Sequence, residues 1–306
     1  MKNHDGKMIN TEKYVLVTAA RNEAAYIERT IRSVLGQTVI PERWVIVSDG
    51  STDGSDEIIE NYANKNPFLE CVRVNRDCRD RNFAAKVHAI GRGYEKVKGV
   101  DFEYIGILDA DVTLPEDYYE KIIHEFQKDP SLGVAGGFIH EPQGGRFKNR
   151  RFNTRASVAG SIQVFRRECY DSIGGLVPAV HGGEDTIAFI MARMKGWRAE
   201  AYPHLIVHHH KPVTGAKMML RSYYRLGMMD YSMGYHPVTE VAKCIYRLAG
   251  KPFFFGAMIQ LCGYFTACLS AVERPVSNEF VSYVRKEHAE RVKSFLMPDS
   301  SRNSSN

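Results

Sequence analysis

The chain has 306 residues, of which 44% are hydrophobic and 25% charged, and this ordinary composition excludes a disordered or fibrous protein. Its net charge of +5 is mild and rises toward the C-terminal half, which favours phospholipid or a phosphorylated substrate as a partner as much as nucleic acid. The six cysteines have no CxxC spacing and too low a density for a disulfide scaffold, so we expect free thiols in a reducing compartment.

In the first half of the chain, short apolar runs alternate with amphipathic patterns. The apolar runs predict strands over residues 14–20, 44–48, 69–74, 104–108 and 134–139. The patterns between them predict helices over residues 27–35, 56–64, 83–94 and 115–128. This alternation predicts an α/β fold: a doubly wound, mostly parallel sheet with helices on both faces and a ligand at the carboxyl ends of its strands.

The second half of the chain has a different pattern. Residues 140–155 are rich in Gly and Arg, which predicts a mobile loop. Beyond it we expect a strand over 161–165, a turn at 174–176, a helix from 182 to 194 and a strand over 202–210. Two or three helices are expected to fill the rest of the chain.

These patterns divide the chain into four parts. Residues 1–12 are polar, lack the apolar core of a signal peptide or anchor, and are expected to be flexible. An α/β domain follows over 13–212, and a helical region over 213–297. The Ser/Asn-rich tail, 298–306, is expected to be disordered.

The segment YIGILDADVTL, residues 104–114, ends a buried strand with two carboxylates. If the strand continues, Asp109 and Asp111 lie on one face because they are two residues apart. Like charges that close are costly unless a cation or hydrogen bonds compensate them, which indicates a ligand site. The alternative is that one of them caps a helix starting at Pro115.

Three predicted strand ends converge on one edge of the sheet: residues 19–21, Asp49, and the Asp109–Asp111 segment. The chain has neither GxGxxG after the first strand nor a GKS/GKT loop, which disfavours dinucleotide and P-loop sites. A diphosphate bound without such a loop needs another counter-charge, and Mg²⁺ or Mn²⁺ on Asp111 would supply it. Asp49 could accept a hydrogen bond from a base or a ribose; an Asx turn is the alternative, more plausible for Asp53.

Four motifs carry a family resemblance: VTAARNEAAYIERTIRSVLGQT, WVIVSDGSTDGS, ILDADV and GGEDTIAFIMARMKGW. Together, over residues 14–210, they resemble the family 2 glycosyltransferases of GT-A fold. The resemblance implies an inverting transfer of a sugar from a nucleotide sugar to an acceptor hydroxyl, with a nucleotide-binding half (13–112) and an acceptor half (113–212). By position it implies contacts to the base from Asp49, a nucleoside pocket lined by Ala19, Arg21 and Glu23, ribose or metal contact by Asp109, metal binding by Asp111, and a general base at Asp185.

An inverting sugar transfer requires the same two functions, a general base and positive charge for the leaving group. One displacement needs a base opposite the leaving group, and a carboxylate at a helix start, in the pair Glu184-Asp185, is placed for this. The leaving diphosphate needs positive charge, from the metal and from Lys86 or Arg21. Simple capping of the helix is the alternative for the acidic pair.

The histidine triplet 208–210 has three interpretations: a metal ligand, which the resemblance supports, a diphosphate contact, or a solvated strand end. On a strand, His208 and His210 share one face and His209 points to the other. By spacing we predict His209 as the third ligand beside Asp109 and Asp111.

Two departures from the family pattern bear on these predictions. Residues 76–82 are unusually charged, which leaves the identity of the nucleotide open. Ile187 stands where many relatives have an acidic residue that is usually not catalytic, so activity is not excluded.

An uncharged run of 21 residues, 252–272, is long enough to cross a bilayer but contains several polar residues. It fits a buried or oligomer-forming helix, an interfacial helix, or a membrane span. Residues 218–237 interleave Met, Tyr and Arg, which fits either a segment lying on an anionic membrane or the stripe of a core helix. Many relatives use lipid-linked or polysaccharide acceptors at the cytoplasmic face of the membrane, which favours membrane contact through residues 215–272. We therefore predict a cytoplasmic protein with peripheral contact at the inner face of the cell membrane.

The predicted function is metal-dependent, inverting glycosyl transfer in the synthesis of surface polysaccharide or a lipid-linked glycan. A sugar-phosphate nucleotidyltransferase would want a Gly- and Lys-rich loop after the first strand, and AARNEAAY is not one. A non-catalytic sugar-nucleotide or membrane-binding module is the other alternative, disfavoured because both acidic motifs are intact. A specific nucleic-acid partner is not expected, since only the basic segment near Arg150 suggests one.

Overall fold

The computed structural model describes residues 13–74, 82–150, 153–211, 216–247 and 253–296. The chain divides into two compact units: residues 1–180 with 184–212, and residues 181–183 with 213–306. The predicted flexible N-terminus and disordered tail lie outside the described residues, as does most of the charged segment 76–82.

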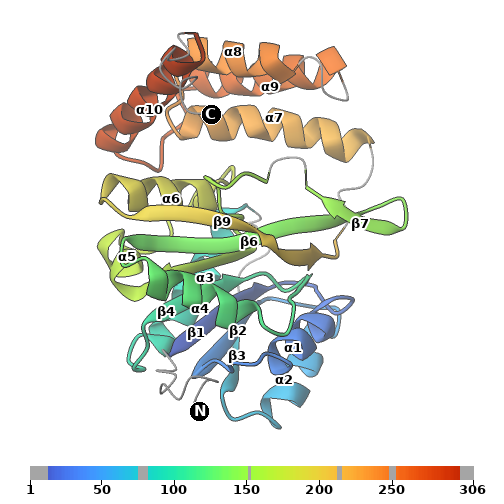
Figure 1. Ribbon diagram of the computed structural model, residues 1–306. Coiled ribbons are helices and arrows are strands. Elements are labelled where there is room, and N and C mark those ends of the chain that lie inside the picture. Colours follow the sequence, from blue (N-terminus) through green and yellow to red (C-terminus); the bar gives the residue numbers. More distant parts are fainter. Residues whose placement is uncertain (1–12, 75–81, 151–152, 212–215, 248–252, 297–306) are drawn as a thin grey trace. The chain divides into compact units, whose positions relative to one another are not determined.

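The first unit is built on a nine-stranded mixed sheet with the strand order β3-β2-β1-β4-β8-β6-β9-β5, with β7 paired to β6 (Figure 1). Neighbours among β3, β2, β1 and β4 are parallel, as are β6 and β9, whereas β8 runs antiparallel to both β4 and β6. The strands are β1 (Tyr14–Ala20), β2 (Arg43–Asp49), β3 (Leu69–Val74), β4 (Tyr104–Leu108), β5 (Val112–Thr113), β6 (Leu132–Gln143), β7 (Arg146–Asn149), β8 (Ile162–Arg166) and β9 (Arg198–His209). The predicted doubly wound, mostly parallel sheet is confirmed.

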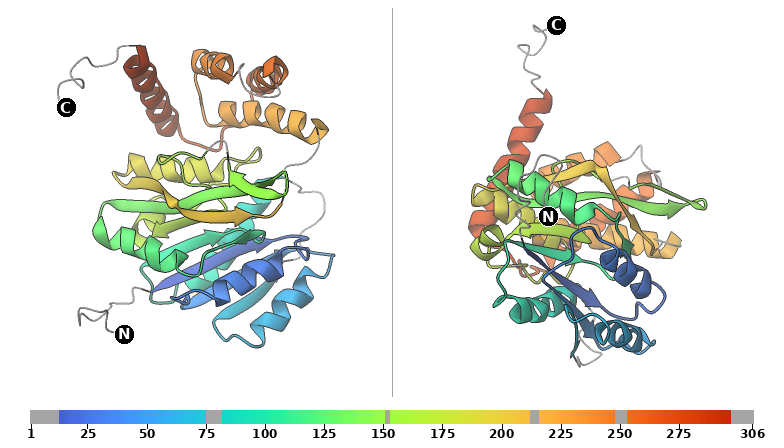
Figure 2. Two further views of the ribbon diagram at one scale, coloured as in Figure 1. Left: turned by 45° about the vertical axis from the view of Figure 1, so that its right-hand side comes forward. Right: turned by 60° about the horizontal axis from the view of Figure 1, so that its bottom comes forward.

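The helices of this unit cover both faces of the sheet, which explains why β1, β2 and β4 are mostly apolar. Tyr14 and Leu16 of β1 belong to the core that α1 and α4 cover. Val17 faces the other way, against Gly93 of α3, where an added Cβ would collide with the valine. Figures 1 and 2 show α1 and α2 side by side. The helices are α1 (Ile27–Leu35), α2 (Ser55–Ala63), α3 (Ala84–Val97), α4 (Tyr118–Lys128), α5 (Arg167–Ser172) and α6 (Glu184–Met194).

The predicted mobile loop over 140–155 is wrong for most of its length. β6 continues to Gln143, and β7 returns from Arg146 in an antiparallel hairpin that pairs these two residues. Gly144 and Gly145 between them have φ angles of 61° and 77°, the conformation of a two-residue hairpin turn. The two glycines that suggested a loop therefore close a tight turn. β9 also begins four residues earlier than predicted, at Arg198.

The second unit consists, in its described part, of four helices. They are α7 (Ala216–Ser232), α8 (Pro237–Arg247), α9 (Phe253–Leu269) and α10 (Asn278–Leu296). The backbones of α7 and α9 touch, because a Cβ added at Gly227 or Gly263 would collide with a carbonyl oxygen of the other helix. Among the described residues, no helix combines the length and the apolar character needed to cross a membrane.

Candidate active site

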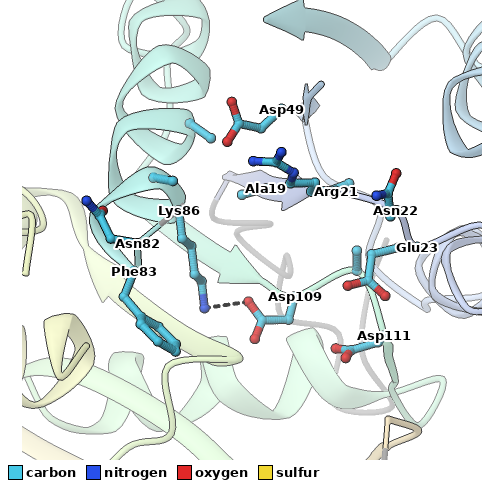
Figure 3. A pocket seen from close by; sticks show the side chains of 14 residues that line it. Ala19, Arg21, Asn22, Glu23, Asp49, Asn82, Phe83, Lys86, Asp109 and Asp111 are labelled. Atoms are coloured by element: carbon cyan, nitrogen blue, oxygen red, sulfur yellow. Dashed lines mark ion pairs between the residues drawn. The ribbon is translucent and has the colours of Figure 1, made fainter. Parts of the chain in front are cut away.

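A cavity of about 560 Å³ opens at the carboxyl ends of β1, β2 and β4 (Figure 3). These strands are adjacent and parallel, so their ends meet at one edge of the sheet. All seven residues that were predicted to contact the donor line the cavity: Ala19, Arg21, Glu23, Asp49, Lys86, Asp109 and Asp111. The structure thus brings together residues up to 92 positions apart in the sequence.

Strand β4 does not continue through Asp109 and Asp111, so the condition under which they would share one face of a strand is not met. β4 ends at Leu108, and the Asp109 amide turns aside to donate a hydrogen bond to the Ser161 carbonyl (3.0 Å). After Asp111 the chain pairs with β9 through β5. Helix α4 begins only at Tyr118, so neither aspartate caps it and that alternative is removed.

The loops that follow β1 and β2 are tied to each other. The Asn22 side chain accepts a hydrogen bond from the Thr52 amide (2.8 Å). Asp53 accepts hydrogen bonds from the amides of Ser55 (3.1 Å) and Ala24 (3.0 Å). Asp53 therefore has the structural turn role expected for it, and Asp49, only 5% exposed, is the carboxylate of this segment that lines the cavity.

Lys86 joins the Asp109 segment to the acidic pair of α6. Its Nζ lies 2.6 Å from Asp109 Oδ1 and 3.7 Å from Glu184 Oε1, and Figure 3 shows the first of these pairs. Burial lowers the pKa of Lys86, but the two carboxylates outweigh this and hold the pKa above its ordinary value. The cavity consequently contains a charged ammonium group, as a diphosphate site requires.

Asp111 faces His209, whose Nε2 lies 3.4 Å from Asp111 Oδ2. His208 instead stacks on Phe147 with ring centroids 4.2 Å apart, and His210 Nε2 lies 2.9 Å from Thr113 Oγ1. His208 and His210 both contact Phe147, so they share a face as predicted. His209 is thereby the member of the triplet whose ring lies against a carboxylate of the cavity.

Three carboxylates lie near one another in the cavity. Figure 3 shows Glu23, Asp109 and Asp111 on the same side of the cavity. Burial, and then the Asp109 charge, raise the pKa of Asp111; burial also raises the pKa of Glu23 although Lys211 Nζ lies 2.6 Å from its Oε1.

One atom of Glu23 and one of His209 bear on metal binding. Glu23 Oε2 and His209 Nδ1 are buried without a hydrogen-bond partner in the described part of the chain. Among those residues, no three His, Cys, Asp or Glu side chains form a chelating group as they stand. The donor set of carboxylate oxygens and an imidazole nevertheless suits Mn²⁺ or Mg²⁺ once phosphate oxygens add to it.

The carboxylates of Glu184 and Asp185 point to different partners. Glu184 is 9% exposed and faces Lys86, and burial raises its pKa despite that cation. Asp185 accepts hydrogen bonds from the amides of Gly160 (3.0 Å) and Thr186 (2.7 Å). A Cβ at Gly160 would lie 2.7 Å from Asp185 Cβ, so only glycine leaves room for this arrangement. The bond to Thr186 also serves the start of α6, as the capping alternative expected.

Several residues of the site were missed from the sequence. Asn82 and the 40% exposed Phe83 line the cavity, one helical turn before Lys86. Their spacing from Lys86, four and three residues, places them on the same side of the helix start and was the signal available. Lys211, the partner of Glu23, follows the histidine triplet directly.

Comparison with a family profile identifies the family of the chain. The profile described as Glycosyl transferase family 2 matches residues 15–194. The poly-beta-1,6-N-acetyl-D-glucosamine synthase of Staphylococcus epidermidis is 28% identical over 181 residues, which are 58% of this chain and 38% of that protein. The chain therefore spans about two fifths of the length of the curated relatives it matches.

Solved structures resemble this chain at low sequence identity. TarS residues 1–349 of S. aureus, solved with UDP-GlcNAc, align with a TM-score of 0.52 and 14% identity over 84% of this chain and 73% of that one. The mannosyltransferase PcManGT of Pyrobaculum calidifontis, solved with GDP-Man and Mn²⁺, aligns with a TM-score of 0.52 and 18% identity over 94% and 81%.

Proposed function

The chain belongs to glycosyltransferase family 2 and has the GT-A fold, and from this we propose that it transfers a sugar, with inversion, from a nucleotide-diphosphate sugar to an acceptor hydroxyl. The observation that carries the proposal is the single cavity in which Asp49, Asp109, Asp111 and Lys86 meet. A sugar nucleotide needs a hydrogen-bond acceptor for its base or ribose and positive charge for its diphosphate, and these residues supply the acceptor and part of that charge.

We infer that a divalent cation, Mn²⁺ or Mg²⁺, is held by Asp111 and His209, with phosphate oxygens of the donor completing the coordination. When bound, such an ion neutralises charge that develops on the leaving diphosphate. Asp109 is a weaker candidate ligand, because one of its oxygens already lies 2.6 Å from Lys86. Its position beside that lysine suits a contact to the ribose, with Lys86 turned toward the phosphates.

Asp185 is our proposed general base. Its hydrogen bonds to the Gly160 and Thr186 amides hold the carboxylate in one orientation, which a base needs in order to receive the acceptor proton. Glu184, in contrast, is positioned to hold Lys86. The two neighbouring acids would then have different roles. Asp185 would accept the proton of the acceptor hydroxyl, and Glu184 would hold Lys86 beside the leaving diphosphate.

The matched variants Asp185→Asn and Glu184→Gln test this division, with UDP-GlcNAc and Mn²⁺ as the first donor probe. With water as the acceptor of the sugar, Asp185→Asn should lower the rate of nucleoside diphosphate release about a thousandfold, because transfer of the proton from the acceptor to the base is lost. Calorimetry should find donor binding almost unchanged. Glu184→Gln should lower both the rate and the affinity for the donor, because Lys86 loses a carboxylate that holds its ammonium group in position. Normal turnover of Asp185→Asn would remove it as the base.

The synthesis of a surface polysaccharide or a lipid-linked glycan is the setting we propose. The printed name of the staphylococcal relative, a polysaccharide synthase, supports this choice. With it comes peripheral contact at the inner face of the cell membrane, through residues 215–272. The rival nucleotidyltransferase would release pyrophosphate from a sugar 1-phosphate and a nucleoside triphosphate, which a coupled assay detects in the same preparation.

A further inference from the structure

Helices α8 and α9 of the second unit have reversed polarity, with charged and polar side chains turned inward and large apolar ones outward. On α8, Glu240 is fully buried and Cys244 nearly so, whereas Val238, Val241 and Ile245 are exposed. Ile245 exposes 61% of its surface. These exposed residues lie three and four positions apart, so they form one stripe along the helix.

Helix α9 repeats the reversal. Its buried side consists of the small residues Gly256, Ala257, Gly263 and Ala267 together with Gln260 and Tyr264. Its exposed side carries Phe254, Phe255, Met258, Phe265 and Leu269, and the last of these is 87% exposed. No residue from 253 to 269 is charged. A helix in contact with water on that side would carry polar residues there.

The inward polar groups pair with one another through ion pairs and hydrogen bonds. Lys243 pairs with Asp230 and lies 3.6 Å from Glu240 Oε2. The Gln260 amide donates hydrogen bonds to Asp230 Oδ2 (2.9 Å) and Glu240 Oε1 (2.7 Å). The three helices α7, α8 and α9 are thus joined through a buried polar cluster, defined as Asp230, Glu240, Lys243 and Gln260. The large apolar residues on the exposed sides of α8 and α9 are left for contact with something outside the unit.

Helix α10 of the same unit shows that the reversal is local. It buries Phe280, Val281 and Val284 and exposes Glu279 and Lys286, the polarity of a helix beside water. α8 and α9 lie side by side (Figures 1 and 2). The apolar surface therefore belongs to this helix pair and does not extend around the unit, which is the pattern of a helix pair lying on an interface.

Charge identifies the partner. Residues 213–306 contain twelve Lys and Arg against seven Asp and Glu, whereas residues 1–212 contain 29 of each kind. All of the net positive charge of the chain therefore belongs to the part that contains α8 and α9. A second copy of the chain would bring the same charge to the surface, whereas an anionic bilayer brings the opposite charge together with apolar acyl chains.

We propose that α8 and α9 lie in the surface of an anionic lipid bilayer, with Val238, Val241, Ile245, Phe255 and Leu269 among the acyl chains. This rests on the peripheral membrane contact proposed above and deepens it by naming the docking surface and the lipid; it requires neither donor nor acceptor. Its failure would leave the catalytic proposal intact.

Sedimentation with vesicles tests the proposal. Vesicles of phosphatidylcholine alone are compared with vesicles that also contain phosphatidylglycerol, and the intact chain should sediment with the second kind. The triple variant Ile245→Glu, Phe255→Glu, Leu269→Glu should partition about a hundredfold more weakly, because three apolar side chains no longer enter the lipid. Ile40→Glu, at an exposed isoleucine of the first unit, is the matched control and should bind like the unchanged chain.

Two further measurements separate insertion from its alternatives. A tryptophan placed by Leu269→Trp should be quenched by brominated acyl chains, which adsorption by charge alone would not produce. Far-UV circular dichroism should be the same for the triple variant, because its substituted side chains are exposed.

Three results would overturn the proposal: a chain that stays in the supernatant with both kinds of vesicle, a triple variant that binds as well as the unchanged chain, or a stable dimer without lipid that the triple substitution converts to monomer. The last would assign the surface to a second copy.

Discussion

Helices α1 and α8 have similar apolar spacing and opposite polarity. In α1, Ile31 is fully buried, while Glu28 and Arg32 form an ion pair of 2.7 Å at the surface. In α8, Glu240 is fully buried and Ile245 is exposed. Each helix sorts its residues into two faces with the period of an α-helix. The spacing of apolar residues therefore identifies the two faces of a helix, but it does not tell which face contacts the protein interior and which is exposed.

The environment of each helix accounts for the difference. α1 covers a sheet whose strands are apolar on both sides, so its apolar face is drawn inward. α8 covers Asp230 and Gln260, groups that require polar partners, so its Glu240 and Lys243 turn inward. Helix α8 is therefore held to α7 and α9 by charge and hydrogen bonding, whereas α1 is held to its sheet by apolar burial.

The largest effect is expected from shortening the buried isoleucine of α1. Ile31→Ala should lower the free energy of unfolding by about 2–4 kcal/mol, because it removes fully buried methylene and methyl groups and leaves a cavity. Urea unfolding followed by tryptophan fluorescence measures this, since Trp44 and Trp197 both belong to the first unit.

Ile245→Ala, the same substitution on α8, is the matched control. Because Ile245 is exposed, the change should stay within about 0.5 kcal/mol. Urea unfolding followed by far-UV circular dichroism, which reports on the helices of both units, measures it. Equal losses in the two variants would show that Ile245 is packed against protein, and the contrast between the helices would collapse.

A smaller effect is expected from removing the cation of the buried polar cluster. Lys243→Met should destabilise the second unit by about 2 kcal/mol, because Asp230 and Glu240 are then buried without a counter-charge and one of them must take up a proton. Hydrogen exchange of peptides from residues 216–296 reports on this unit directly. Lys286→Met, at the exposed face of α10, should leave exchange unchanged; a similar effect of both would count against the cluster.

The last prediction concerns pH. Burial, and then the neighbouring Asp230, raise the pKa of Glu240 from 4.5 to about 7, against the attraction of Lys243. The folded state thus binds this proton more tightly than the unfolded state, so the contribution to stability is present at low pH and is lost as pH rises from 4.5 toward 7. The expected loss is roughly 3 kcal/mol, because each pKa unit between the folded and unfolded states is worth about 1.4 kcal/mol.

Urea unfolding followed by circular dichroism at several pH values measures that loss. Glu240→Gln, which keeps the shape of the side chain and cannot ionise, should flatten the dependence. A dependence that persists in this variant would have to come from another group.

The strands around the candidate active site were predictable, because a strand that is buried on both faces has a short continuous run of apolar residues. β1 and β4 are short apolar runs, and a polar residue marks the end of each, so the cavity edge followed from the strand ends. The histidine triplet was not predictable in the same way. Whether His209 faces Asp111 depends on the pairing of Val112 with His209 in β5 and β9, which is a contact between distant segments.

Two other features were beyond the sequence for physical reasons. A Gly-Gly pair permits either a loose loop or a tight hairpin turn, and pairing of Gln143 with Arg146 decides between them. The uncharged run 252–272 allowed three environments, because its composition is the same whichever side of the helix faces protein. The backbone contact with α7 is what assigns the small residues to the inside.

That backbone contact has a consequence for how the protein can vary. Because Gly227 and Gly263 bring α7 and α9 together main chain to main chain, the helix pair keeps its spacing without help from the large residues of α9. Phe254, Phe255 and Met258 can then be exchanged for other apolar residues without disturbing the joint. The apolar side chains on the exposed surface can therefore change, by evolution or by design, while the packing of α7 against α9 stays the same.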